Sequence, residues 1–157
     1  MKVAFSTLGC KVNTYETESI SALFLKDGFE RVNFNEYSDV YIINTCTVTN
    51  SGDSKSRKTI RRAIKRNPEA VVAVMGCYAQ MSPEDIVEID GVDIVIGTKH
   101  RENLHTLVRE FLRKREQIKN VTDVSRYRVF DEVNVTNFTE NTRAFLKIQD
   151  GCNNFCS

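Results

Sequence analysis

The chain has 157 residues, of which 41% are hydrophobic and 27% charged, and its formal net charge is +1. These values are typical of one globular domain with its own core, and they exclude a basic field spread over the whole chain. No apolar run approaches the ~20 residues that span a bilayer, and polar Ser6 and Thr7 come too early for a secretory signal. We therefore expect a cytoplasmic protein without membrane contact, in which the five cysteines favour metal binding or catalysis over disulfides.

The chain opens with a strand candidate over residues 2–8, followed directly by Gly9 and Cys10. Asn13 is the expected N-cap of a helix, with Glu16 three positions on as its capping-box partner. Gly28 is the expected end of that helix. The pattern predicts a first strand and a first helix.

Two further strands and a basic helix follow. Residues 29–34 are a short strand candidate, and the apolar run 40–43 is typical of a strand covered on both faces. Residues 54–66 form a basic helix that ends at Asn67-Pro68. The run 70–75 is the most hydrophobic in the chain and predicts another strand.

The last elements of this domain are a helix that starts at Ser82-Pro83, a strand over 93–96 and a helix from about Arg101 to Glu116. Strands that alternate with helices predict an α/β fold with a doubly wound, mostly parallel, five-stranded sheet of the flavodoxin or Rossmann kind. The expected organisation is a domain over 1–117, a linker over 118–141 and the first strand of a second domain within 142–157.

Cys10, Cys46 and Cys77 each follow a predicted strand at its carboxyl end. In an open parallel sheet these ends share one edge, where ligands bind. With the strand order 2-1-3-4-5, strands 1, 3 and 4 are neighbours ~4.8 Å apart, so the thiols are expected to converge. Buried cysteines at strand ends are also ordinary core residues, but three on one edge favour a binding site.

Three thiolates do not complete a structural zinc site, which has four ligands. His100 and His105 are the candidates for a fourth ligand, although both follow the fifth strand. An iron–sulfur cluster is the other candidate, because cysteine thiolates hold such clusters.

Four segments resemble a known family. Lys147 to Ser157, with Cys152 and Cys156, is similar to the opening of the radical S-adenosylmethionine motif, Cys-x3-Cys-x2-Cys, whose third cysteine would lie two positions past Ser157. Three more segments resemble the methylthiotransferase branch of that superfamily, in the family's order. They are Thr7–Asn13, Ile43–Thr49 and Val74–Gln80.

The resemblance implies two 4Fe–4S clusters. Cys10, Cys46 and Cys77 would hold an auxiliary cluster, and Cys152 and Cys156 would begin the cluster that cleaves S-adenosylmethionine. It also implies tRNA as the partner, and an electron donor such as flavodoxin or ferredoxin. With two of three ligands for the second cluster and most of the catalytic barrel missing, the chain alone is expected to be inactive.

The substrate follows from resemblance as well. The run Gly9 to Glu16 is similar to the branch that adds a methylthio group at C2 of N6-threonylcarbamoyladenosine beside the anticodon. Other branches act on isopentenyl-adenosine in tRNA or on an aspartate of a ribosomal protein, and both stay open as alternatives. From another class, a non-enzymatic iron–sulfur or zinc binding module is the competing hypothesis.

Two surface features complete the sequence predictions. The basic helix offers phosphate contacts to tRNA, and a solvated helix face is an equally good interpretation; the candidate residues are Arg57, Lys58, Arg61, Arg62 and Lys65. The strand-like tail 142–149 lacks partners, so we expect it to be disordered or to pair with another edge, with exchange between two copies as the favoured ordered form.

Overall fold

The computed structural model describes residues 1–47 and 50–123. The strands are β1 (Lys2–Thr7), β2 (Glu30–Val32), β3 (Val40–Thr45), β4 (Val71–Gly76), β5 (Ile94–Ile96) and β6 (Ile118–Asn120). The helices are α1 (Lys11–Lys26), α2 (Asn50–Arg66), α3 (Cys77–Met81), α4 (Pro83–Val87) and α5 (Leu104–Lys114), with a 3₁₀ turn, η1 (Arg101–Asn103), before α5.

All six strands form one parallel sheet in the order β2-β1-β3-β4-β5-β6. This confirms the predicted α/β class and the predicted order of the first five strands. The count of five was wrong, because residues 118–120 add β6 beside β5 instead of beginning a linker. Two things favour the extra strand: Ile118 packs on the core, and the Ile118 amide donates to Asp93 O at 2.8 Å, which pairs an otherwise open edge.

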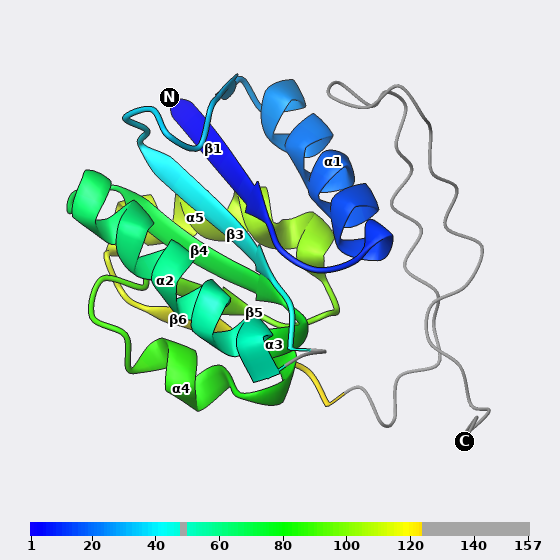
Figure 1. Ribbon diagram of the computed structural model, residues 1–157. Helices are drawn as coiled ribbons and strands as arrows, with labels where there is room; N and C mark the ends of the chain where they lie inside the picture. The colour runs from blue at the N-terminus through cyan, green and yellow to red at the C-terminus, as the bar shows by residue number, and fades with distance from the viewer. Residues whose placement is uncertain (48–49, 124–157) are drawn as a thin grey trace.

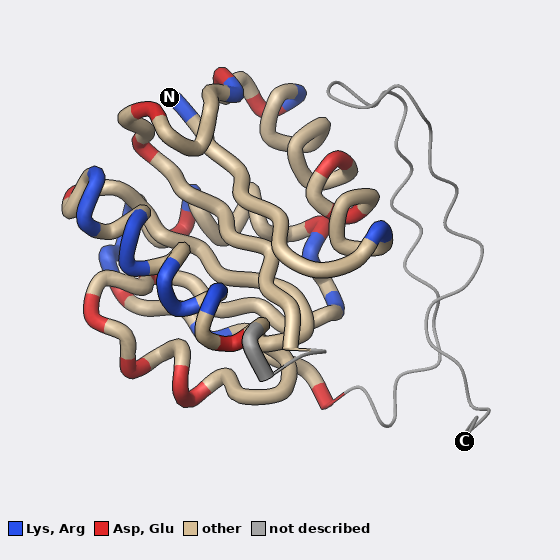
Figure 2. The backbone as a smooth tube through the Cα atoms, viewed as in Figure 1, with Lys and Arg blue, Asp and Glu red and all other residues tan. Residues whose placement is uncertain are grey.

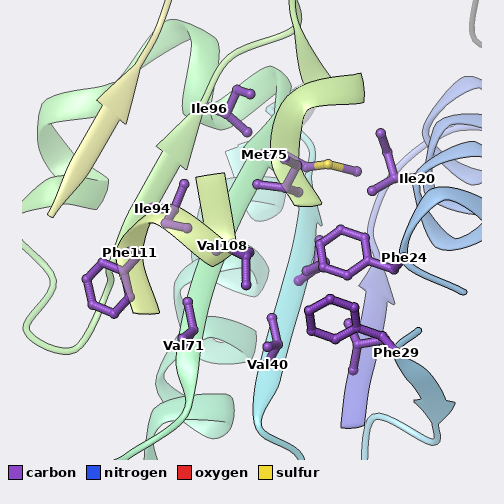
Figure 3. Close-up of a cluster of buried hydrophobic side chains, with 14 residues drawn as sticks. Ile20, Phe24, Phe29, Val40, Val71, Met75, Ile94, Ile96, Val108 and Phe111 are labelled. Atoms are coloured by element: carbon purple, nitrogen blue, oxygen red, sulfur yellow. The ribbon is translucent and has the colours of Figure 1, made fainter. Parts of the chain in front are cut away.

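The sheet is covered on both faces, as the continuous apolar runs predict. Every residue of β3 and β4 is buried, and alternate side chains point to opposite sides. In Figure 1, α2 crosses in front of β3 and β4 while α5 lies behind the sheet. Val40, Val71 and Met75 pack with Phe24 of α1 and Val108 of α5 in one core (Figure 3).

The second core fills the other side of the sheet. Tyr41, Ile43 and Val74, the alternate residues of the same strands, pack there against Ile60 of α2 and Ile86 of α4. The sheet therefore carries two separate apolar layers. In the central strand β3 the polar residues, Asn44 and Thr45, lie at its carboxyl end.

The first helix begins earlier than predicted. Cys10 is its N-cap, with extended backbone angles (φ −98°, ψ 176°), and Asn13 lies inside the first turn. Asn13 is therefore not the cap. The predicted capping-box geometry is lost because both side chains have partners elsewhere in the fold, as described below.

The remaining differences are local. Helix α2 begins at Asn50, four residues before its predicted start, and the short α3 was not predicted. No described helix combines the length and apolar character needed to cross a bilayer. The predicted second domain, including the tail strand 142–149, lies outside the described residues.

Candidate functional site

The three candidate cysteines of the first domain lie at one edge of the sheet. Cys10 caps α1 after β1, Cys46 directly follows Thr45 at the end of β3, and Cys77 opens α3 directly after β4. Since β1 pairs with β3, and β3 with β4, the three are carried by neighbouring parallel strands (Figure 1). The chain also reverses its direction of winding between β1 and β3, which is where open α/β sheets bind ligands.

The loops at this edge are in close contact. A Cβ atom on Gly9 would stand 2.6 Å from Cys46 Cβ and 2.8 Å from Cys46 Sγ. A Cβ atom on Gly76 would overlap Asn44 and come within 2.5 Å of Thr45 O. Only glycine allows this approach, and both glycines have positive φ, +103° and +99°. Each glycine immediately precedes a cysteine, so the packing brings the backbones of the cysteine loops together.

Burial and neighbouring charges at this edge affect the pKa of the Cys77 thiol. Cys10 is exposed, Cys46 is buried and Cys77 is half-buried. Burial raises the pKa of the Cys77 thiol, and the charges of Cys46, Glu16 and Cys10 raise it further, while Arg101 opposes them. Without a bound cation Cys77 is therefore a protonated thiol at neutral pH, and a metal or cluster must displace its proton.

A buried ion pair lies beside the cysteines. Glu16 of α1 pairs with Arg101 of η1, and both side chains are less than a tenth exposed. The pair joins the first helix to the loop that follows β5.

We tested whether the donors present suit a metal or cluster. Within residues 1–47 and 50–123, no group of three or more His, Cys, Asp or Glu side chains is arranged to hold a single metal ion. Three thiols at one edge are nevertheless the ligand type of an iron–sulfur cluster, which cysteine thiolates hold. The donor chemistry fits a cluster, and the ligand roles of Cys10, Cys46 and Cys77 stay a prediction.

The predicted fourth zinc ligands lie elsewhere. His105 Nδ1 is 2.9 Å from Glu102 O, and its ring packs edge-on against Phe24 with 6.3 Å between centroids. His100 lies 3.6 Å from the Glu102 carboxylate. Neither belongs to a described ligand group with the cysteines.

Several polar residues at this edge were missed as functional residues by sequence reasoning. Asn13 and Asn44 are buried and tie the cysteine loops together through backbone carbonyls. On α3, Gln80 Oε1 accepts from Thr98 N at 2.9 Å, and Gln80 Nε2 donates to Thr122 O at 3.0 Å. All three lie in the segments that carry the family resemblance, which was the available signal.

The basic helix presents two different faces. Arg57, Arg61 and Lys65 line a hollow of about 520 Å³. Its other wall carries the acids Asp85, Glu88 and Asp90 of α4 and the following loop. Figure 2 shows the Lys and Arg residues along α2 and the acids on the neighbouring α4 segment.

Other basic residues of α2 are arranged differently. Arg57 Nη1 also donates to Tyr78 Oη at 2.8 Å. Lys58 and Arg62 are exposed, and the Arg62 guanidinium lies 5.1 Å from the centre of the Phe34 ring. The five candidates therefore do not form one uniform basic surface.

Cys152 and Cys156, the predicted ligands of the second cluster, fall outside the described residues.

Comparison with known proteins places the chain among named relatives. It is 56% identical over 155 residues to the threonylcarbamoyladenosine tRNA methylthiotransferase MtaB of Bacillus subtilis, covering 99% of this chain and 34% of that protein. It is 42% identical to the MtaB of Aquifex aeolicus, covering 100% and 38%. It is 32% identical to the tRNA-2-methylthio-N(6)-dimethylallyladenosine synthase of Ehrlichia canis, covering 95% and 35%.

The chain spans about a third of the length of these curated relatives. The profile of the family described as "Uncharacterized protein family UPF0004" matches residues 2–97. That stretch holds Cys10, Cys46 and Cys77 together with β1 to β5, so the match covers both the sheet and the candidate site. The chain therefore belongs to the UPF0004 family.

Proposed function

We propose that this chain is the amino-terminal part of a tRNA methylthiotransferase that adds a methylthio group at C2 of N6-threonylcarbamoyladenosine next to the anticodon. The names of the relatives from Bacillus subtilis and Aquifex aeolicus support this substrate. The likeness to the Ehrlichia canis synthase keeps isopentenyl-type adenosine as the second candidate. The activity is proposed for a protein that contains this chain and the catalytic barrel.

The observation that carries the proposal is the convergence of Cys10, Cys46 and Cys77 at the carboxyl ends of three neighbouring strands. In the proposal these three thiolates would hold a 4Fe–4S cluster. When bound, such a cluster would supply the sulfur chemistry of the reaction. Cys152 and Cys156, with a third cysteine past Ser157, would hold the second cluster, which would supply the chemistry that cleaves S-adenosylmethionine.

The protein's own residues prepare the first site. Gly9 and Gly76 allow the three loops to approach one another, and burial shields the Cys46 thiol from water. The Glu16–Arg101 pair fixes α1 against the loop after β5. Residues on rigid strand ends hold ligands more accurately than residues on long loops.

The basic helix supplies the second element of the proposal, a contact with the tRNA backbone. Phosphate contacts by Lys and Arg give salt-sensitive affinity without reading sequence. In this role Arg57, Lys58, Arg61, Arg62 and Lys65 are the candidates from sequence. The two faces of α2 separate them into groups that can be tested independently.

The test begins with cluster content. The protein is purified anaerobically, and its iron, sulfide and zinc contents and its charge-transfer absorption are measured. Single Cys10→Ala, Cys46→Ala and Cys77→Ala variants are expected to lose iron from the first site. Zinc without sulfide would instead support the non-enzymatic binding module.

The activity test uses nucleosides. Mass spectrometry of tRNA from cells that carry the full-length protein should show 2-methylthio-N6-threonylcarbamoyladenosine, and each cysteine variant should abolish it. The 157-residue chain alone is expected to give none. A methylthio mark on isopentenyl-adenosine, or on a ribosomal-protein aspartate, would change the substrate and keep the reaction.

A further inference from the structure

Asn13 lies at the centre of the cysteine edge and is almost completely buried, with 2% of its surface exposed. Its side-chain nitrogen donates to Leu8 O at 2.7 Å and to Thr45 O at 3.1 Å. Its side-chain oxygen accepts from the Cys10 thiol at 3.7 Å. Both amide hydrogens are therefore donated to carbonyls, one directly after β1 and one at the end of β3.

The two carbonyls are placed just before the cysteines. Leu8 is two positions before Cys10, and Thr45 is immediately before Cys46. One amide group thus connects the backbone that leads to each cysteine. A direct backbone bond, from Leu8 N to Asn44 O at 2.9 Å, shows that the same two loops run side by side.

Asn44 extends this connection toward the third cysteine. Its side-chain nitrogen donates to Asn13 O at 2.9 Å and to Thr17 Oγ1 at 3.2 Å. Its side-chain oxygen is buried without a hydrogen-bond partner in the described part of the chain, and it lies where a Cβ of Gly76 would be. The two asparagines therefore contact the backbone next to all three cysteines.

A neutral amide suits this place better than a charged group. The edge already holds three cysteine side chains, which bind a metal or cluster as thiolates, and the carboxyl group of Glu16. Asparagine supplies two donors to carbonyl oxygens without adding a negative charge. Aspartate, which has nearly the same shape, would remove both donors and set a carboxylate against Leu8 O and Thr45 O.

We propose that Asn13 is a positioning residue, assisted by Asn44, that fixes the separation of Cys10 and Cys46 before any ligand binds. The part of this inference that concerns cluster binding rests on the proposed function. The part that concerns the distance between the Cys10 and Cys46 thiols does not, and it can be tested without iron. A preformed spacing of ligands is what allows a site to bind its group without reordering the loops.

The experiment compares Asn13→Asp and Asn13→Ala with the parent chain, all in a background where Cys152 and Cys156 are alanine. Asn13→Ala removes the donors without adding a charge. Asn67→Asp is the matched control, because Asn67 is also buried and also donates to a carbonyl, Ser38 O at 2.8 Å. It precedes β4, at the amino edge of the sheet, away from the cysteines.

The first readout is iron and sulfide per folded chain after anaerobic reconstitution, with the electron paramagnetic resonance spectrum of the reduced cluster. We expect both Asn13 variants to hold about tenfold less iron and sulfide per folded chain, because each loses two buried hydrogen bonds, or to show a shifted spectrum. Asn67→Asp should keep the parent content and spectrum even if its melting temperature falls equally. A parent-like cluster in both Asn13 variants would overturn the proposal.

The second readout needs no iron. With Cys77 also replaced by alanine, phenylarsine oxide bridges Cys10 and Cys46 when the two thiols are close, and the Asn13 variants should bind it roughly tenfold more weakly. If the parent binds no cluster but this difference is found, the proposed function fails and the positioning role stands. If the variants are bridged as well as the parent, or if the parent is not bridged, the positioning role is wrong.

Discussion

Gly9 lies directly against the side chain of Cys46, and the contact is possible only because Gly9 has no Cβ. A methyl group there would stand 2.6 Å from Cys46 Cβ and 2.8 Å from Cys46 Sγ. Both distances are well inside van der Waals contact. The loop that carries Gly9 and Cys10 therefore helps to fix the position of Cys46.

Gly9→Ala should destabilise the fold and displace Cys46. Positive φ costs alanine ~1–2 kcal/mol, and overpacking adds ~1–3 kcal/mol. Gly28→Ala is the control, because Gly28 also has positive φ (+84°) but nothing within 4 Å of the added methyl group. Urea denaturation should show a larger loss for Gly9→Ala, and iron content should fall in that variant alone. Equal losses in both would mean that the loop adapts to the methyl group.

Arg101→Met should destabilise the protein by about 3–5 kcal/mol, because it leaves the buried Glu16 carboxylate without its guanidinium partner. The double variant Arg101→Met, Glu16→Gln should recover at least about 1 kcal/mol. Lys114→Met breaks an exposed pair with Glu110 and should have a much smaller effect, because water screens exposed ion pairs. Additive losses in the double variant would contradict a coupled pair.

The two faces of α2 should differ in tRNA binding. Lys55, Lys58 and Arg62 are exposed and share one helical face by their spacing. The remaining candidates, Arg57, Arg61 and Lys65, line the hollow opposite its acids. Those carboxylates reduce the attraction of the three basic side chains for phosphate.

Replacing Lys55, Lys58 and Arg62 by glutamine should therefore weaken tRNA binding at low salt. The slope of log affinity against log salt concentration is negative, and its magnitude should decrease by about 2–3. The same change at Arg57, Arg61 and Lys65 should have a smaller effect, measured by filter binding of the full-length protein over a salt series. Equal, negligible effects of both triple variants would leave α2 as a solvated helix face.

Asp93→Asn should stabilise the protein at neutral pH. Burial raises the pKa of the Asp93 carboxyl, and the hydrogen bond from Val72 N, at 2.8 Å, opposes that shift only in part. A raised folded-state pKa favours the protonated form, so the stability that this group contributes is present below its unfolded pKa and is lost as pH rises through the folded value.

Asparagine keeps an oxygen for Val72 N and carries no charge. The gain in unfolding free energy should therefore be several tenths of a kcal/mol to about 1 kcal/mol at pH 7, and should disappear below about pH 4. Urea denaturation of both proteins across pH 3–8 measures it. A gain that persisted unchanged in acid would point to a cause other than the carboxyl charge.

Much of the fold is readable from the sequence because burial follows simple periods. The apolar runs at β3 and β4 are buried on both faces, and the Gly-Cys pairs come where strands end. These patterns were enough to predict a parallel sheet and the common edge of Cys10, Cys46 and Cys77, and the strand order followed from the comparison with flavodoxin-like sheets. The three-residue β6 was missed, since Ile118–Asn120 is too short and too polar to show a period.

The asparagine connection could not be predicted, because its partners are distant in sequence. Asn13 followed by Glu16 has the local signature of a helix cap. In the folded protein the Asn13 amide reaches Thr45 O, and Glu16 pairs with Arg101. Tertiary partners therefore replaced the local ones, and a pattern of neighbouring residues contains no information about them.

The short strand β6 also decides where the rest of the chain begins. Helix α5 ends at Lys114, at the amino edge of the sheet, and β6 carries the backbone back to the cysteine edge, where Gln80 holds Thr122 O. The described chain therefore ends at the sheet edge that carries Cys10, Cys46 and Cys77, and Cys152 follows about 30 positions later in the sequence. Groups joined through one chain meet at a raised effective concentration, and the return of the backbone along β6 places the start of that connection at the cysteine edge.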